Sequence, residues 1–321
     1  MKILFTSVGR RVELLEAFRA AAEKLNIDLS VIGADMSESA PAMYFCDERV
    51  IAPRIRSEEY IPFLLSLCER EGVDCLIPTI DTDLLTLAEN KSAFEAVGTR
   101  VLVASADKVR LCRDKRLTGE YLVSLGLNAP VACDSVSGYK GGFPAFIKPL
   151  DGSSSINAYK VENAEDLALY AERIGDYVIQ PFVSGREYTV DIFCDYGGNP
   201  VFITPRERLA VRAGEVLQTE ICQDDSIIEE MKILVRDFKP SGQITVQLIK
   251  DSSGRNNYIE INPRFGGGAP LSIKAGADSA EAALRMLGGE ELTYVPYAAR
   301  DKEVYARFDQ SICVRAGVGR D

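Results

Sequence analysis

The chain has 321 residues, of which 46% are hydrophobic, and this is enough to form two or three packed units. Its formal net charge of −11 argues against nucleic acids as partners, because an acidic surface repels a phosphodiester backbone. The sequence contains no histidine, which excludes Ser-His-Asp and Cys-His catalysis and most zinc sites. Any chemistry must therefore use Lys, Arg, Asp, Glu or a bound metal ion.

The eight cysteines have no CxxC spacing, and several of them lie inside apolar runs, as Cys75 and Cys194 do. This distribution is typical of reduced thiols in a core. The chain starts with a strand instead of a basic and apolar leader, and no apolar run approaches the ~18 residues of a membrane helix. These features predict a cytoplasmic protein that has no membrane partner.

The first 105 residues alternate apolar strands with amphipathic helices. Strands are expected at 2–7, 29–35, 74–77 and 101–104, with helices at 10–25, 57–71 and 81–96. This alternation predicts a parallel sheet with helices on both faces, in which ligands lie at the carboxyl ends of the strands. A nicotinamide cofactor is disfavoured there, because the dinucleotide fingerprint needs three glycines and the first turn has only Gly9.

Two lysines in the next part of the chain are candidates for binding an anion. Lys115 falls in the first turn of an expected helix, where the helix dipole disfavours a cation, so either an anionic ligand or plain solvation would explain it. Lys148 is the one charge in the apolar strand 143–150, and an ammonium group there needs a partner. The small residues of 151–161 follow, and they let backbone N–H groups approach phosphate oxygens.

Residues 177–195 are expected to form two strands joined by a bend. In this segment Gln180, Phe182 and Val183 would line an apolar slot that suits a flat base. Glu187 is placed to accept hydrogen bonds from two sugar hydroxyls. An ordinary β-ladder with Glu187 in solvent is the alternative interpretation.

Several charged residues are candidates for contacting a substrate, and the sequence does not rank them. Arginines suit a carboxylate or a phosphorylated intermediate, whereas aspartates at a helix start also act as caps. The candidates are Asp35, Asp81, Asp83, Arg206, Arg208 and Arg212.

Residues 242–264 contain two alternating apolar runs on either side of SSGR, a pattern that predicts a β-hairpin. A hairpin that is symmetric about this turn places Gln247 opposite Glu260, with Asn262 on the same face. Three oxygen donors beside Arg264, just past the strand end, are typical of a Mg²⁺ site that also holds phosphate. A solvated outer face of an ordinary hairpin is the alternative.

The order of these motifs resembles the ATP-grasp family over roughly residues 1–290. The motifs that carry the likeness are Lys115, FIKP with Lys148, the Gly/Ser loop, QPFVSGREYTVD, Gln247 and EINPR. The large subunit of carbamoyl phosphate synthase is similar in placing a glutamine at the first metal position. By contrast, FGGGAP after EINPR is more similar to single-module amino-acid ligases.

The resemblance implies a fold in which an α/β, Rossmann-like pre-ATP-grasp domain precedes two α+β subdomains that clasp ATP. The implied units are a pre-ATP-grasp domain at 1–105, a lid subdomain with linking helices at 106–184, a large subdomain with the metal site at 185–300, and a tail at 301–321.

The resemblance also implies a role for each candidate residue. Those that contact ATP would be Lys115, Lys148, Gly152, Ser153, Ser154, Ser155, Gln180, Phe182, Val183 and Glu187. The ligands of one or two Mg²⁺ ions, or of Mn²⁺ in their place, would be Gln247, Glu260 and Asn262. Arg264 and Lys148 would be catalytic, with Arg264 steadying the γ-phosphate and the acyl phosphate made from it.

The implied reaction joins a small carboxylate, with an amino acid as one candidate, to an amine through an acyl phosphate. It needs no histidine, because phosphoryl transfer depends on positioning and charge neutralisation. A homodimer is expected for this class. The alternatives are a carbamoyl phosphate synthase-like activity, an ATP-binding module without turnover, and a nicotinamide-dependent oxidoreductase built on the first domain.

Overall fold

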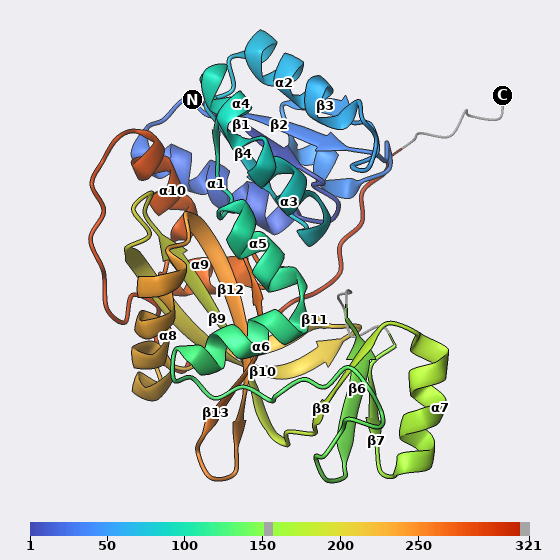
Figure 1. Cartoon of the computed structure of the whole chain (residues 1–321). Helices are drawn as coiled ribbons and strands as arrows, with labels where there is room; N and C mark the ends of the chain where they lie inside the picture. Colours follow the sequence, from blue (N-terminus) through green and yellow to red (C-terminus); the bar gives the residue numbers. More distant parts are fainter. Residues whose placement is uncertain (151–156, 315–321) are drawn as a thin grey trace, which may run out of the picture.

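A computed structural model describes residues 1–150 and 157–314 of the chain, and within them the strands form three sheets (Figure 1). The N-terminal sheet and its helices lie at the top of Figure 1, and the largest sheet lies below them. The smallest sheet, with one helix against it, lies at the lower right. The fold thus combines an α/β unit with two α+β units, as the sequence predicts.

The N-terminal unit is a parallel sheet of five strands among the described residues, in the order β3-β2-β1-β4-β5. Its elements are β1 (Lys2–Thr6), α1 (Val12–Leu25), β2 (Ser30–Asp35), the 3₁₀ helix η1 (Pro41–Phe45), β3 (Glu48–Ile51), α2 (Tyr60–Glu71), β4 (Cys75–Pro78), α3 (Asp81–Glu89), α4 (Lys91–Ala96) and β5 (Arg100–Val101). The sequence missed β3, a half-exposed edge strand without an apolar run. It also placed β5 one residue late and too long, because only Arg100 and Val101 pair with β4.

Two linking helices and a small antiparallel sheet follow. They are α5 (Ala106–Arg113), α6 (Lys115–Ser124), β6 (Ala145–Pro149), β7 (Tyr159–Val161), α7 (Ala164–Ile174) and β8 (Tyr177–Pro181). Asp114 caps α6, because its carboxylate accepts hydrogen bonds from the backbone N–H groups of Arg116 and Leu117. The small sheet buries Ile147 and Ile179 against α7, so Phe146 and Lys148 lie on its other face.

The third unit is a mainly antiparallel sheet in the order β13-β12-β9-β10-β11-β14. Its elements are β9 (Gly185–Cys194), β10 (Pro200–Arg212), β11 (Glu215–Ile221), α8 (Asp225–Phe238), β12 (Gly242–Asp251), β13 (Asn256–Asn262), α9 (Ala269–Ala275), α10 (Ser279–Leu287) and β14 (Val304–Ala306). Helix α8 covers one face with an apolar stripe that ends at Phe238. The buried residues of that face alternate with polar residues, which therefore point to the opposite face.

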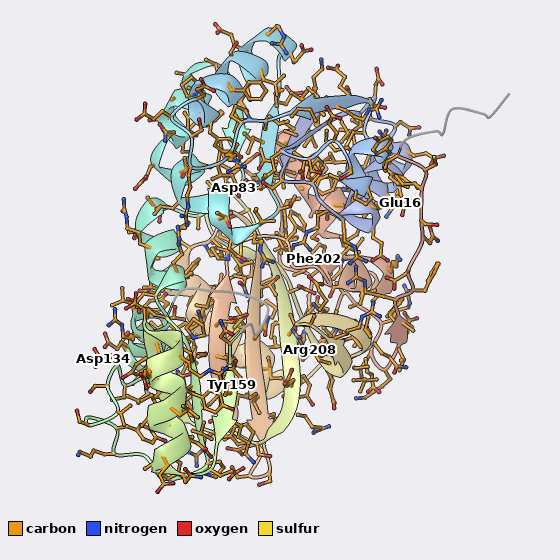
Figure 2. All side chains as sticks on the ribbon, turned by 90° about the vertical axis from the view of Figure 1, so that its right-hand side faces the viewer. Glu16, Asp83, Asp134, Tyr159, Phe202 and Arg208 are labelled. Atoms are coloured by element: carbon orange, nitrogen blue, oxygen red, sulfur yellow. The ribbon has the colours of Figure 1, made fainter. Side chains whose placement is uncertain are left out.

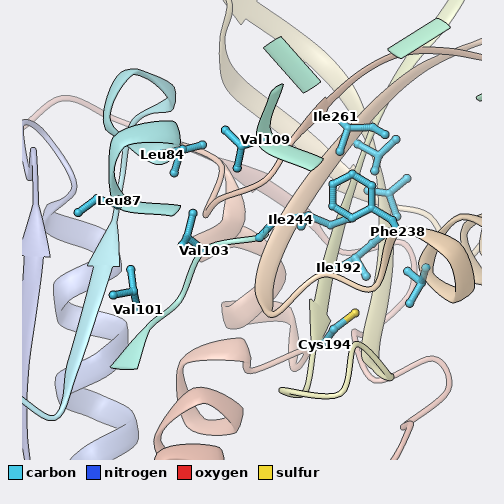
Figure 3. Packing of buried hydrophobic residues seen from close by; sticks show 14 of the residues in the cluster. Leu84, Leu87, Val101, Val103, Val109, Ile192, Cys194, Phe238, Ile244 and Ile261 are labelled. Atoms are coloured by element: carbon cyan, nitrogen blue, oxygen red, sulfur yellow. The ribbon is translucent and has the colours of Figure 1, made fainter. Parts of the chain in front are cut away.

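One hydrophobic core joins the large sheet to the N-terminal unit. Figure 3 shows Leu84 and Leu87 of α3 close to Val103, with Ile244 of β12 and Phe238 of α8 beyond it. All five residues belong to one buried cluster. This shared core fixes the carboxyl ends of the parallel strands next to the large sheet.

The segment after β14 also ties the units together. It runs beside the N-terminal sheet, as the red trace in Figure 1 shows. Asp309 forms ion pairs with Arg10 at 3.3 Å and with Arg212 at 3.1 Å, and the Tyr44 hydroxyl donates to the carbonyl of Val314. Within the described residues, no helix is both long and apolar enough to cross a membrane.

Candidate functional site

The β12–β13 hairpin has the register that the sequence predicts at its functional end. Gln247 pairs with Glu260, and Thr245 pairs with Asn262. The predicted symmetry of the turn is wrong by one residue, because nearer the turn Leu248 pairs with Tyr258. A β-bulge between these pairings restores the register, so the three proposed metal ligands still share one face.

The pairing continues across β9 and β10 and creates a polar face on the large sheet. Gln247 is flanked by Thr189, and Thr189 by Arg206, so one row of the sheet reads Arg206, Thr189, Gln247, Glu260. We call this side, which is opposite to α8, the polar face. Asp191 and Asn262 also belong to the polar face, because each is two residues beyond a member of this row, Thr189 and Glu260 respectively.

The donor set on the polar face fits a hard metal ion that keeps water or phosphate ligands. It offers one carboxylate, Glu260, and the amide oxygens of Gln247 and Asn262. The Asn262 amide donates to Glu260 at 3.0 Å, so the two side chains are already in contact. No group of three His, Cys, Asp or Glu in the described residues makes a metal site alone. Mg²⁺ suits such a sparse set, since it takes few protein ligands and completes its shell with water and phosphates.

Lys148 and Lys115 reach toward this face from the small sheet and from α6. Lys148 is only 7% exposed, and burial lowers the pKa of its ammonium group to about 8. The Glu260 carboxylate raises this pKa and the Lys115 ammonium group lowers it, so the three charges interact. Lys115 donates to the carbonyl of Leu150 at 3.0 Å, whereas no described residue accepts a hydrogen bond from Lys148. A buried ammonium group without an acceptor indicates a place for an anion.

The residues proposed for the base lie on the small sheet and its exit. Phe182 is half-buried, with its ring 6.3 Å from that of Phe146, and Lys160 lies 4.9 Å above it. Val183 is also half-buried. Gln180 is buried, and its side-chain amide donates to the carbonyl of Pro130 at 2.8 Å. The amide nitrogen of Gln180 therefore has a structural partner, while the two apolar side chains are open to a ligand.

Glu187 and Arg208 lie at the outer end of the polar face. Glu187 is exposed, as the alternative interpretation expects, and it pairs with the half-buried Arg208 at 3.4 Å. Figure 2 shows Arg208 in the large sheet, below the N-terminal unit. Arg212 instead lies near the tip of β10 and pairs with Asp309, away from this face. The Gly/Ser loop candidates lie outside the described residues, and they are Gly152, Ser153, Ser154 and Ser155.

Arg264 connects the hairpin to the N-terminal sheet. Its guanidinium group donates to Asp81 at 2.6 Å, and the side chain is 13% exposed. Asp81 is the first residue of α3, and the N-cap of this helix, Ile80, makes no side-chain cap. The described side-chain partner of Asp81 is Arg264. The carboxyl ends of the parallel strands thus meet the end of the β12–β13 hairpin.

Beside Arg264 lies a buried network that the sequence prediction missed in part. Arg206 donates to Asp191 at 2.8 Å, and the same carboxylate accepts from Thr245 and Ser272. Both members of the ion pair are nearly inaccessible to solvent. The signal for Asp191 was a single charge in the apolar run VDIFC, the same kind of signal that singled out Lys148.

Two other acidic candidates have structural partners within the N-terminal unit. Asp35 accepts from the backbone N–H of Gly9 and from that of Ser37, both at 2.9 Å, so its two oxygens hold the loops around them. Because both oxygens of Asp35 already accept hydrogen bonds from the backbone, Asp35 is poorly placed to bind a ribose hydroxyl.

Asp83 is completely buried, and it joins three elements of the N-terminal unit (Figure 2). One carboxylate oxygen accepts from Thr6 at 2.8 Å, from Tyr60 at 3.2 Å and from Ser7 at 3.3 Å, while the other has no described partner. Burial raises the pKa of Asp83 to about 6. Asp83 is therefore a structural carboxylate that is poorly stabilised in its charged form.

Asp83→Asn should change how stability depends on pH. Between the unfolded pKa of Asp, about 3.9, and about 6, the folded protein keeps a proton that the unfolded chain has lost. The wild type therefore loses stability relative to the variant as pH rises through this window, by up to about 3 kcal/mol. Urea unfolding at pH 4 and pH 7 measures this, with Asp28→Asn at an exposed position as the reference. Parallel pH profiles for Asp83→Asn and wild type would contradict the assignment.

Comparisons with known proteins agree with this architecture. Residues 3–102 match a family model described as the PylC-like, N-terminal domain, and residues 173–307 match one described as ATP-grasp in the biosynthetic pathway with Ter operon. The chain is 25% identical over 298 residues to the arginine-specific large chain of carbamoyl phosphate synthase from Oryza sativa subsp. japonica. That match covers 81% of this chain but 25% of the relative, so the chain spans about a quarter of its length.

A second relative is similar over a shorter region, and one solved structure is similar over most of the chain at a lower sequence identity. D-alanine–D-alanine ligase of Francisella tularensis subsp. holarctica is 29% identical over 170 residues, covering 46% of this chain and 56% of that protein. N5-carboxyaminoimidazole synthetase from Staphylococcus aureus, solved with ADP, has a TM-score of 0.75 at 17% identity, covering 91% of this chain and 78% of that one. The structural likeness confirms the expected fold over nearly the whole chain.

Proposed function

We propose that the chain is an ATP- and Mg²⁺-dependent carboxylate–amine ligase of the ATP-grasp type, which works through an acyl phosphate. The match of residues 173–307 to an ATP-grasp family model supports this proposal. The observation that carries the proposal is Lys148, which is buried without a described acceptor and interacts with Glu260 on the facing sheet. Cation, carboxylate and amide oxygens then face one space between the small and large sheets. Such a space suits a metal-bound triphosphate.

The nucleotide would span the two subdomains. Phe182 and Val183 would pack on the base, and Lys148 and Lys115 would neutralise phosphate charge in a site that largely excludes water, where such interactions are strong. Gln247, Glu260 and Asn262 would hold Mg²⁺, which supplies charge neutralisation and polarises the transferred phosphoryl group when bound. Glu187 would accept from the ribose at the open end of the cleft.

The reaction would proceed in two steps that need no histidine. A carboxylate oxygen of the acid attacks the γ-phosphorus, the bond to the bridging oxygen breaks, and ADP leaves with the electron pair. Arg264 neutralises the acyl phosphate that results. An amine then attacks the acyl carbon, phosphate leaves with its electron pair, and the amine loses a proton to give the amide.

A carbamoyl phosphate synthase-like activity is the second candidate. The 25% identity to a carbamoyl phosphate synthase large chain over 81% of this chain favours it. In that case the acid would be bicarbonate or carbamate, and the same cleft would phosphorylate it. The joint presence of Lys148, Glu260 and Arg264 favours the ligase over a module that binds ATP without turnover.

Finer features of the protein are proposed on the same basis. We place the domain bounds at 1–105, 106–184 and 185–300, with residues after 300 as a C-terminal segment. We also propose a cytoplasmic location, a homodimeric state, and Mn²⁺ as a substitute for Mg²⁺.

An ADP-release screen tests the proposed function. The assay would contain ATP, Mg²⁺ and one acid at a time, drawn from amino acids, other small carboxylates and bicarbonate. Hydroxylamine as the amine would trap an acyl phosphate as a hydroxamate, which forms a coloured complex when Fe³⁺ is added. We expect one class of acid to raise ADP release and to yield hydroxamate. ATP binding without stimulation by any acid would support the module without turnover instead.

A further inference from the structure

Three consecutive glycines after the hairpin mark a site at the junction of the units. A Cβ on Gly267 would lie 2.5 Å from a carboxylate oxygen of Glu215 and 2.9 Å from Nη1 of Arg11. A Cβ on Gly268 would lie 2.5 Å from Nη2 of Arg206. Neither glycine has a positive φ, so the lack of a side chain makes room for these charged groups. The backbone of the glycine run therefore lies directly against charged side chains.

Arg11 lies next to Gly267 and forms no ion pair with a carboxylate of the described residues. It is the residue just before α1, and its guanidinium group donates to the carbonyl of Thr79 at 3.0 Å. Among the described residues no Asp or Glu forms an ion pair with it. Burial and the nearby charge of Arg264 lower the pKa of Arg11 to about 10. Two guanidinium groups held together in a partly buried place stabilise an anion between them.

Glu215 supplies the opposite charge beside Arg11. Both side chains lie close to the same point above Gly267, yet no ion pair or hydrogen bond between them exists in the described structure. The described partner of Glu215 is Arg307, at 3.5 Å. The Glu215 carboxylate and the Arg11 guanidinium group are thus close together, and each can form further hydrogen bonds with a ligand.

Nearby polar atoms also lack partners. Buried atoms without a hydrogen bond in the described structure include Nη1 of Arg206, Nε of Arg264 and the hydroxyl of Thr189. Such atoms are rare in folded proteins unless water or a ligand satisfies them. Thr189 and Arg206 are in the same row of the polar face as Gln247, and Arg264 follows the end of β13.

We propose that Arg11 and Glu215 bind the carboxylate and the ammonium group of an α-amino acid, which is the acid that the enzyme activates. This inference rests on the proposed ligase function. In an α-amino acid the two charged groups are on one carbon, so a cation and an anion side by side above one glycine match them. A dicarboxylate would instead place like charges at Glu215, and a hydroxy acid would leave Glu215 without a cation. Arg264, which borders this site, then meets the acyl phosphate.

Comparing amino acids with their hydroxy analogues tests the site. ADP release would be measured with each common L-amino acid and with D-alanine, and then with the α-hydroxy acid that matches the best one. For the wild type we expect at least about tenfold stimulation by an amino acid, and at least about tenfold lower kcat/KM for its hydroxy analogue. Glu215→Gln should raise KM for the amino acid about tenfold and bring the amino-to-hydroxy ratio close to one.

A matched variant and a space-filling variant complete the test. Glu220→Gln on the same strand, whose carboxylate pairs with Lys302, should keep the wild-type ratio. Gly267→Ala should lose amino-acid stimulation at least about tenfold, because its methyl group would occupy the space between Arg11 and Glu215.

Calorimetry with ATP separates failure of this inference from failure of the proposed function. If ATP binds but acids without an amine stimulate equally well, or no amino acid stimulates, the amino-acid site is overturned. An unchanged amino-to-hydroxy ratio in Glu215→Gln overturns it too. If ATP itself does not bind, the ligase function falls and the amino-acid site with it.

Discussion

Glu260→Gln is expected to lower Mg²⁺-dependent ADP release by about 10³-fold, equivalent to about 4 kcal/mol. Glu260 is the one carboxylate among the proposed metal ligands, and its charge also acts on Lys148. Glutamine keeps the size and one carbonyl oxygen but removes the charge that holds a divalent cation. Steady-state ADP release with the best acid, at several Mg²⁺ concentrations, measures the effect.

A matched control keeps this result from reflecting a folding defect. Glu229→Gln changes an exposed carboxylate on α8, whose partner is Lys232 on the same helix. We expect this control to retain wild-type turnover, and both variants to keep the wild-type circular dichroism and melting temperature. Undiminished turnover in Glu260→Gln would remove the metal assignment.

Lys148→Ala is expected to weaken ATP binding by about 10- to 100-fold, because charge-assisted hydrogen bonds contribute about 1.5–3 kcal/mol. The wild type should also bind ATP less tightly as pH rises above about 8, since the ammonium group then loses its proton and its charge. The variant has no such group and should not show this dependence on pH. Calorimetric titration with ATP and Mg²⁺ at pH 7 and pH 9 measures both effects.

Lys140→Ala provides the comparison for Lys148→Ala. Lys140 is in the same part of the chain, but its ammonium group is at the surface and donates to the carbonyl of Ser137. We expect this variant to bind ATP as the wild type does. If Lys148→Ala also keeps wild-type affinity, Lys148 is an amphipathic structural lysine whose stem is buried and whose head is solvated.

The sequence predicted the hairpin and its functional end because period-2 alternation is a local signal. Two local errors cancelled there. The pairing nearest the turn differs by one residue from the assumed register, and the bulge between the Gln247 and Leu248 pairings restores that register farther along the strands. A bulge depends on how strands twist and pack in the whole sheet, and no residue pattern in 242–264 marks it.

The contacts of Arg11 and Glu215 could not be predicted in the same way. Arg11 precedes the first helix, whereas Gly267 follows the last strand of the hairpin, so their contact depends on how the units pack. Asp191 could have been found, since a single charge in an apolar strand had already singled out Lys148. Buried charges in strands therefore deserve the same weight at every position, whatever motif surrounds them.

A crystal structure with Mn²⁺ and a non-hydrolysable ATP analogue tests the central claim most directly. The anomalous signal of Mn²⁺ identifies the metal position independently of the surrounding map. The expected result is a peak bonded to the Glu260 carboxylate and to an amide oxygen of Gln247 or Asn262, with analogue phosphates against Lys148 and Lys115. A nucleotide bound instead at the carboxyl ends of the N-terminal strands, near Gly9 and Asp35, with no metal on the hairpin, would contradict the ligase assignment.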